Sequence, residues 1–326
     1  MRLTAPHPSI LRRTILLGSL LFGLAATAVP RPSHAADRLE SWNDPARRRA
    51  VPVRLRLPHG NAQAPVVVLS HGLGGSRDGL AYLGAALAEA GFVAIHVQHV
   101  GTDTAIWRGQ ADPSASMAAA VLDLRRAADR LRDIAFVLDT LAHQPSLRGR
   151  INPARIAIAG HSYGAWTVTH MLGQSLPGGA LVEQQLGIAL PDPRLSAGIA
   201  LSPVPPIGIP PDQAYDRVRA PILHVTGTLD RGTLEAATVE DRLVPYRNIA
   251  APSVLVVLRG AGHAAFAGEP AAGPRWNDPT FHDRTARLAV LFLRATLLRD
   301  PVAGALLARG AGLAAGDRVE TRGTLG

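Results

Sequence analysis

The stretch RIAIAGHSYGAW, residues 155–166, joins a short apolar run to a serine that stands between two glycines. The run Arg155–Ala159 has the composition of a buried strand, and the pattern after the serine is helical to about Leu172. Glycines at these positions permit a strained strand-to-helix turn that lifts the serine hydroxyl clear of the sheet. This context predicts that Ser162 is a nucleophile, whereas Gly-x-Ser-x-Gly by itself is a weak signal in a chain with 32 glycines.

Apolar runs and helical patterns alternate on both sides of this stretch. Strand-like runs occupy residues 51–57, 65–70, 92–97, 197–201, 221–225 and 254–258. Helical patterns occupy residues 80–90, 116–143 and 281–298. Such alternation predicts an α/β fold with a mostly parallel central sheet and helices on both faces. Hydrophobic residues make up 47% of the 326 residues, which is enough for a single domain of this class, assigned to residues 36–315.

The first 35 residues have the pattern of an export signal. An arginine pair at residues 12–13 precedes an uncharged apolar run that ends near Val29, and Ser33-His34-Ala35 is a small-x-small cleavage site. The arginine pair also suits a twin-arginine signal, so that route and ordinary secretion both remain open. A retained membrane anchor is the alternative, but the run is short for a bilayer span and prolines follow it. We expect an exported protein, periplasmic or secreted, without stable membrane insertion after cleavage.

Composition excludes several classes of site. There are no cysteines, which excludes disulfides, thiolate metal sites and a cysteine nucleophile. All 34 basic residues are arginines, and they are scattered along the chain instead of forming one basic run. No nucleic-acid partner is therefore expected, although the net charge is +9.

Two proline- and glycine-rich stretches, residues 174–195 and 203–220, are too long for simple turns in a compact domain. Loops of this length are commonly functional, so we expect them to form lids or walls of a binding site, and mobile surface insertions are the alternative. Trp107 and Trp166 are candidates for lining the same site, although aromatic side chains more often serve packing. The final segment, residues 316–326, is polar and glycine-rich and is expected to be a disordered tail.

A serine hydroxyl attacks an acyl carbon only when an imidazole accepts its proton and a carboxylate orients that imidazole. In folds of this class the three groups follow in the order serine, acid, histidine, after successive strands. Asp230 follows the strand-like run that ends in HVTG, 68 residues after Ser162. His263 follows the segment LRGAG, another 33 residues along the chain. We therefore predict Ser162, Asp230 and His263 as a catalytic triad.

The acid is the least determined member of this set. Asp212, Asp216 and Asp241 are nearby carboxylates, and an ordinary solvated loop acid is the alternative interpretation of each candidate. Of the 12 histidines, His263 is the one that lies in a glycine-flanked loop after a strand and downstream of a suitable acid.

Acyl transfer places negative charge on the former carbonyl oxygen, which preorganised backbone N–H groups stabilise. One donor is expected at Tyr163, directly after the nucleophile. The second is expected at Leu73, in the turn His71–Gly75, where glycines let the backbone approach a substrate closely. A plain glycine-rich loop is the alternative interpretation of that turn.

At these residues the sequence resembles the α/β-hydrolases that include platelet-activating-factor acetylhydrolases and predicted dienelactone-hydrolase-like esterases. The resemblance spans most of residues 50–300, and its segments keep that group's order and spacing: SHGLGG, GFVAIHVQHVG, RLRDIAFVLDTL, GHSYGAWT, DPRLSAGIALSP, PILHVTGTLD and GAGHAAF. It implies the α/β-hydrolase fold, with Leu73 and Tyr163 at the positions that supply oxyanion donors in that group. True dienelactone hydrolases use a cysteine nucleophile, which this chain lacks, so their particular reaction is not implied.

The resemblance implies a serine esterase or lipase-like enzyme that acts on a small-molecule or lipid ester, with no cofactor and no metal. His71, His96 and His99 could suggest a metal site, but no cluster of acids accompanies them at ligand spacing. Two alternatives remain open. One is an amidase or peptidase with the same triad, and the other is a non-catalytic ligand-binding protein on the same fold.

Overall fold

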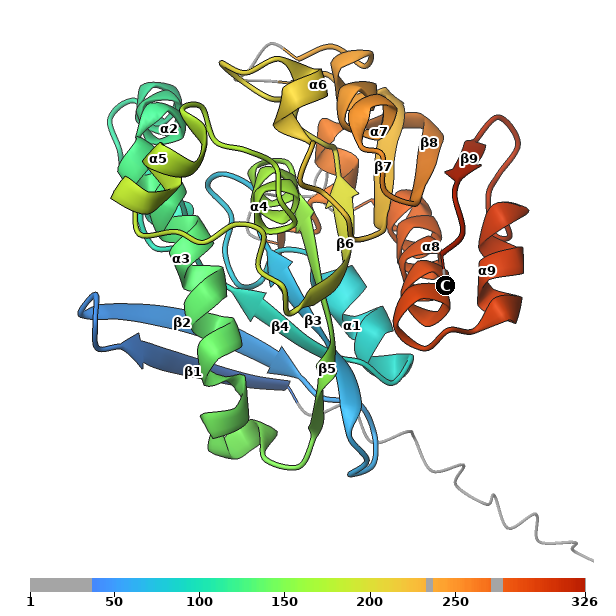
Figure 1. Ribbon diagram of the computed structural model, residues 1–326, viewed down its shortest axis with the longest axis horizontal. Coiled ribbons are helices and arrows are strands. Elements are labelled where there is room, and N and C mark those ends of the chain that lie inside the picture. Colours follow the sequence, from blue (N-terminus) through green and yellow to red (C-terminus); the bar gives the residue numbers. More distant parts are fainter. Residues whose placement is uncertain (1–36, 233–236, 271–277, 326) are drawn as a thin grey trace, which may run out of the picture. The chain divides into compact units, whose positions relative to one another are not determined.

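The computed structural model describes residues 37–232, 237–270 and 278–325, so the export signal predicted for residues 1–35 lies outside the described residues. The described residues form one compact unit around a nine-stranded sheet (Figure 1). The sheet is mostly parallel and helices are interspersed between its strands. The predicted fold class is therefore confirmed as an α/β fold, consistent with an α/β-hydrolase.

The strands are β1 (Asp37–Asp44), β2 (Arg49–Arg56), β3 (Ala64–Ser70), β4 (Val93–Val97), β5 (Ile151–His161), β6 (Leu195–Leu201), β7 (Ile222–Leu229), β8 (Ser253–Gly262) and β9 (Arg318–Arg322). The α-helices are α1 (Ala81–Glu89), α2 (Pro113–Leu122), α3 (Leu124–Thr140), α4 (Tyr163–Met171), α5 (Gly179–Gln185), α6 (Pro211–Ala214), α7 (Val244–Asn248), α8 (Pro279–Leu297) and α9 (Pro301–Ala308). Short 3-10 turns are η1 (Thr104–Ile106), η2 (Leu141–His143), η3 (Pro145–Leu147), η4 (Asp241–Leu243) and η5 (His263–Phe266). Within the described ranges, none of the helices has the length and apolar character needed to cross a membrane.

The strand order is β1-β2-β4-β3-β5-β6-β7-β8-β9. The six strands from β4 to β8 in this order pair in parallel, while β1, β2 and β9 pair antiparallel at the two sides. Parallel strands end at a common edge, so the loops after β3, β5, β7 and β8 meet there. This topology explains why residues far apart in the sequence can converge on one site.

Alternating side chains of the central strands enter two separate hydrophobic clusters, one on each face of the sheet. In β3, Val66 and Val68 belong to the cluster that contains buried residues of α3 and α4. Val67 and Leu69 belong to the cluster that contains buried residues of α1 and α8. Because β3 is buried on both faces, its sequence is a continuous apolar run without polar alternation.

The helical pattern predicted over residues 116–143 is two helices, not one. Asp123 separates α2 from α3 with extended backbone angles of φ −82° and ψ 101°. Its side chain accepts hydrogen bonds from the amides of Arg125 and Arg126 and so caps the start of α3. An aspartate that competes for the backbone in this way interrupts a helix although the apolar periodicity continues.

The prediction of a disordered tail over residues 316–326 is wrong for its central part. Arg318–Arg322 forms β9, which pairs antiparallel with β8. The turn before it is fixed by Asp317, whose carboxylate accepts from the Arg259 amide and pairs with Arg284. Backbone pairing at a sheet edge needs no apolar side chains, so polarity alone did not reveal this strand.

Several histidines are buried and carry lowered pKa values. Burial lowers the pKa of His96, His161 and His224 from 6.5 to about 3, and that of His170 to about 4. Burial disfavours the charged imidazolium, and nearby arginines add to this effect at His96 and His224. These imidazoles are therefore neutral in the native protein at neutral pH.

We expect the free energy of unfolding to decrease as the pH falls below about 6.5, the pKa of histidine in an unfolded chain. Down to a pH of about 3 to 4, the unfolded chain binds protons that the native protein cannot bind. Each such imidazole therefore lowers the free energy of unfolding by up to about 1.4 kcal/mol for each pH unit. Urea titrations at pH values from about 7 to 4 measure this slope.

His224→Leu is the matched variant for this measurement. Within the described residues neither ring nitrogen of His224 has a hydrogen-bond partner, so leucine removes a proton site without removing a hydrogen bond. In this variant the free energy of unfolding should depend less steeply on pH, by the contribution of one buried histidine. A free energy that is constant between pH 7 and 5 in the parent, or an unchanged slope in the variant, would contradict this account.

Candidate active site

Ser162 lies at the turn between β5 and α4 with φ 55° and ψ −115°, a backbone conformation that is rare for a non-glycine residue. The glycines on either side are required by close backbone contacts. A Cβ atom at Gly160 would lie 2.4 Å from the Gly164 carbonyl, and one at Gly164 would lie 2.0 Å from the Ser70 oxygen. The strained turn is therefore held directly against the end of β3.

The structure brings the three predicted triad side chains together in one hydrogen-bonded chain. His263 Nε2 lies 2.9 Å from Ser162 Oγ, and His263 Nδ1 lies 2.9 Å from Asp230 Oδ1. The carboxylate only accepts hydrogen bonds, so Nδ1 carries the proton and Nε2 is free to accept from the serine hydroxyl. Asp212 is exposed, and the side chain of Asp241 accepts from Thr238, so neither takes the place of Asp230.

Asp230 is fully buried. Burial alone would raise its pKa, but the hydrogen bond and charge of His263, together with the positive charge of Arg242, lower the pKa to about 2. Thr226 donates a further hydrogen bond to Asp230 Oδ2 at 2.8 Å. The acid is therefore ionised at neutral pH and held in one orientation.

Two residues that contact this acid–histidine pair, Arg242 and His161, were not predicted from the sequence. The buried Arg242, in η4, lies with Nε 3.3 Å from Asp230 Oδ1 and donates through Nη1 to the Pro203 carbonyl at 3.2 Å. His161, next to the nucleophile, lies with Nε2 2.9 Å from the His263 carbonyl oxygen. Both contacts join residues that are distant in the sequence, and no local pattern announces them.

The two predicted oxyanion donors belong to two segments of the chain, the start of α4 and the turn His71–Gly75 after β3. Tyr163 is the first residue of α4. The backbone hydrogen bond that opens this helix runs from the Trp166 amide to the Ser162 carbonyl, so the Tyr163 amide is one of the first N–H groups of the helix, which lie before its hydrogen-bonded turns. Leu73 lies in a turn whose next residue, Gly74, donates to Thr102 O at 2.8 Å and accepts from Trp107 Nε1 at 2.7 Å.

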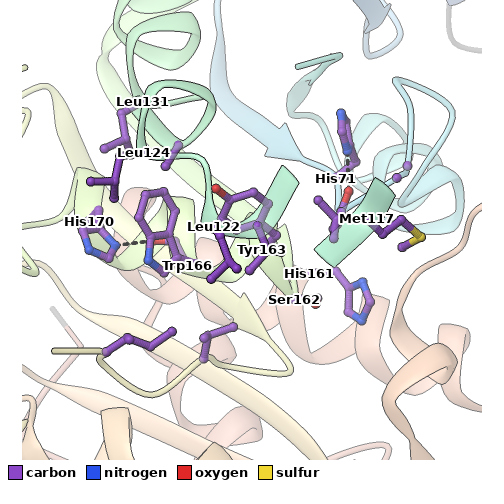
Figure 2. A pocket seen from close by; sticks show the side chains of 18 of the residues that line it. His71, Met117, Leu122, Leu124, Leu131, His161, Ser162, Tyr163, Trp166 and His170 are labelled. Atoms are coloured by element: carbon purple, nitrogen blue, oxygen red, sulfur yellow. Dashed lines mark hydrogen bonds between the residues drawn. The ribbon is translucent and has the colours of Figure 1, made fainter. Parts of the chain in front are cut away.

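Ser162, His263, Leu73 and Tyr163 all line one cavity of about 550 Å³. Figure 2 shows Ser162 and Tyr163 in this cavity, together with Trp166 and Leu122. Most of its other walls are apolar. They include Trp107, Met117, Val121, Leu122, Leu124, Leu131, Trp166, Leu176, Val182, Leu186, Val204 and Ile207. The two long loops predicted to be lids or walls contribute to this lining from residues 174–186 and 204–207. Both tryptophans that were only candidates also line it.

The histidines that could suggest a metal site are engaged in hydrogen bonds. His71 Nε2 accepts from the His99 amide at 3.0 Å, and His99 lies between Ser70 and Asp133. His96 Nδ1 lies 2.9 Å from the Gly79 carbonyl. In the part of the chain that the structure describes, no group of three or more histidines and acids is placed to hold a metal ion.

Comparison with known proteins gives a match to a family model over one segment of the chain. Residues 50–129 match the family model of platelet-activating factor acetylhydrolase, isoform II. This confirms the resemblance predicted from the sequence over the segment that carries the turn His71–Gly75. The matched segment is less than half of the chain and ends before Ser162. No curated protein matches the chain. The match indicates a hydrolase of the acetylhydrolase type.

Gly164→Ala is expected to lower the free energy of unfolding by about 3 kcal/mol, because the new methyl group would overlap the backbone oxygen of Ser70. Gly304→Ala in α9 is the matched control, since its Cβ would meet Ala295 Cβ at an ordinary 3.7 Å. Alanine favours a helix over glycine by roughly 1 kcal/mol, so the control should be neutral or stabilising. Equal stability of both variants in urea titrations would refute the steric argument.

Proposed function

We propose that the protein is a serine hydrolase that cleaves carboxylic esters through an acyl-enzyme on Ser162. The observation that carries this proposal is the hydrogen-bonded chain Ser162–His263–Asp230, with both contacts at 2.9 Å, at the wall of an apolar cavity. The match of residues 50–129 to an acetylhydrolase family supports the ester as the bond that is cleaved.

In the first half of the reaction, His263 Nε2 takes the proton of Ser162 Oγ as that oxygen attacks the ester carbonyl carbon. The ionised Asp230 holds the Nδ1 proton and stabilises the imidazolium that forms. The carbonyl oxygen becomes an oxyanion, which the amides of Leu73 and Tyr163 are proposed to stabilise. The imidazolium then protonates the leaving alcohol, and the acyl group remains on Ser162.

In the second half, water takes the place of the alcohol. His263 accepts a proton from this water, whose oxygen attacks the acyl carbon, and the same amides hold the second oxyanion. Breakdown of the intermediate returns the proton to Ser162 Oγ and releases the carboxylic acid. Every proton therefore passes through one imidazole, and no further acid or base is required.

The character of the cavity supports an apolar substrate group. Its walls come from aliphatic and aromatic side chains of α2, α3, α4 and the loop after α4. Burying apolar surface stabilises binding by about 0.8 kcal/mol for each methylene group, so an alkyl or aromatic ester gains from this site. Leu122 and Ile207, which line it, are 80% and 65% exposed, so the apolar lining continues to the protein surface.

We expect the protein beginning at Ala36 to hydrolyse p-nitrophenyl esters, and Ser162→Ala to reduce kcat by at least about 10³-fold. Ser175→Ala is the matched control, because Ser175 lines the same cavity but has no place in the triad. A series from acetyl to palmitoyl esters then measures which chain length the cavity prefers. Preference for acetyl supports an acetylhydrolase, and preference for long chains supports a lipase.

Three outcomes would count against the ester proposal. Equal inactivity of parent and Ser162→Ala on every ester would refute it. Hydrolysis of amides at a higher rate than esters would favour the amidase alternative. Binding of the esters without turnover, and without labelling by a serine-reactive phosphonate, would favour a ligand-binding protein.

The choice of acid is tested by Asp230→Asn, which is expected to lower kcat by about 10⁴-fold, because an amide at this position favours the wrong imidazole tautomer. Asp241→Asn is the matched control from the same region, since that carboxylate contacts Thr238 and not His263. The measurement is kcat of both variants and the parent on the ester that the parent hydrolyses fastest. Comparable losses in the two variants would show that Asp230 has no special role.

A further inference from the structure

A second buried arginine, besides Arg242, contacts the turn His71–Gly75. Arg130, in α3, has no exposed surface. In the part of the chain that the structure describes, no carboxylate lies within ion-pair distance of its guanidinium. Burial lowers its pKa to about 10, so it stays charged at neutral pH. A buried cation without a contacting anion is costly, and its hydrogen bonds must compensate.

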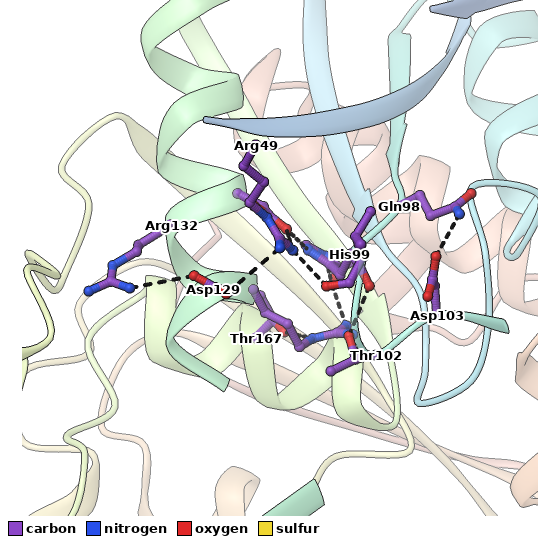
Figure 3. A network of polar contacts seen from close by, with 12 residues as sticks. Arg49, Gln98, His99, Thr102, Asp103, Asp129, Arg132 and Thr167 are labelled. Carbon is purple, nitrogen blue, oxygen red and sulfur yellow. Dashed lines mark hydrogen bonds and ion pairs between the residues drawn. The ribbon is translucent and has the colours of Figure 1, made fainter. Parts of the chain in front are cut away.

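Those hydrogen bonds go to four acceptors. Nη2 donates to the His71 carbonyl at 2.5 Å and to Ser70 Oγ at 3.0 Å. Nη1 donates to Thr102 Oγ1 at 2.8 Å, and Nε donates to Thr167 Oγ1 at 3.1 Å. Thr102 and Thr167 are labelled in the polar network of Figure 3. The planar guanidinium is suited to this task because its N–H groups point in fixed, separate directions.

The contacts of Arg130 with His71 and Thr102 fix the turn that carries Leu73 from both sides. His71, whose carbonyl accepts from Arg130, lies two residues before Leu73. Thr102, which also accepts from Arg130, receives the amide of Gly74 on its own carbonyl at 2.8 Å. Leu73 therefore lies between two backbone positions that are connected to the same guanidinium.

The remaining contacts fix Tyr163. Thr167 accepts from Arg130 and donates its own proton to the Tyr163 carbonyl at 2.9 Å. The guanidinium carbon of Arg130 also lies 4.5 Å from the centre of the Tyr163 ring, a cation–π distance. One side chain thus contacts the supports of both proposed oxyanion donors, which belong to loops after different strands.

Arg130 is itself held by a chain of hydrogen bonds with consistent proton positions. Ser70 Oγ accepts from Arg130 and lies 3.0 Å from His99 Nε2, and His99 Nδ1 lies 3.2 Å from Asp133 Oδ2. Burial and the charge of Arg130 lower the pKa of His99 well below its usual value, so Nε2 is free to accept the Ser70 proton. Asp133 pairs with Arg49 at 2.8 Å.

We propose that Arg130 is a positioning residue that sets the spacing of the Leu73 and Tyr163 amides and so preorganises the oxyanion hole. This inference rests on the proposed ester hydrolysis. It assigns no contact between Arg130 and substrate, because the guanidinium acts through His71, Thr102, Thr167 and the Tyr163 ring.

Arg130→Gln is expected to lower kcat by about 10²-fold with little change in KM, since removing oxyanion stabilisation has effects of this size. The decisive readout compares each ester with its thionoester, whose C=S sulfur is a poor hydrogen-bond acceptor. An intact oxyanion hole favours the oxygen ester, so the ratio of the two kcat/KM values should fall in Arg130→Gln by about the same factor as kcat.

Arg284→Gln is the matched control, because Arg284 forms a partly buried ion pair with Asp317 away from the cavity. It should lose stability while keeping kcat and the ester-to-thionoester ratio. Thr167→Val removes one contact of Arg130 and the hydrogen bond that carries this contact on to the Tyr163 carbonyl. It should give a smaller change in the same direction, which keeps the test available if Arg130→Gln does not fold. An unchanged ratio in a folded variant would overturn the proposal.

Hydrogen exchange tests the same positioning without any turnover. In Arg130→Gln the amides of residues 71–75 and 163–166 should exchange at least about tenfold faster than in the parent, and in Arg284→Gln they should not. If the parent hydrolyses no ester, the proposed function fails while this measurement still decides whether Arg130 orders both segments. Unchanged exchange in both segments would refute the positioning role.

Discussion

The contact between Gly164 and the end of β3 is the constraint on which the rest of the site depends. Only a residue without a Cβ atom can bring the start of α4 this close to the Ser70 carbonyl. The contact brings the turn at Ser162 beside the turn that carries Leu73, so the proposed nucleophile and the proposed oxyanion donors share one edge of the sheet. His263 follows β8 and Asp230 follows β7, and these two strands are neighbours in the same sheet.

Two buried arginines have different electrostatic roles at this edge of the sheet. Arg242 contacts the carboxylate of Asp230 and helps to keep it ionised. Among the described residues, Arg130 contacts neutral acceptors and an aromatic ring, and the negative charge of Asp133 partly opposes the lowering of its pKa by burial. Arg242 thus compensates a buried anion, whereas Arg130 holds neutral groups in place through hydrogen bonds.

Much of this arrangement could be predicted from the sequence, because its main parts are local. A serine between glycines, or a histidine after a strand-like run, is visible in a short window, and strand order then brings Ser162 and His263 together. Arg130 and Arg242 could not be recognised in this way, since each is one arginine among 34 and its role depends on contacts from distant segments. The break at Asp123 and strand β9 were missed because backbone hydrogen bonds decide them, and apolar periodicity does not record such bonds.

Strand β9 occupies the edge of the sheet beside β8. An uncovered β8 would present a row of free backbone N–H and C=O groups, which is a template for pairing with another chain and for aggregation. β9 covers that row, and its own sequence, RVETR, presents charged side chains that disfavour further pairing. Removal of residues 318–322 would therefore expose the backbone groups of β8, and it is expected to favour pairing with another chain.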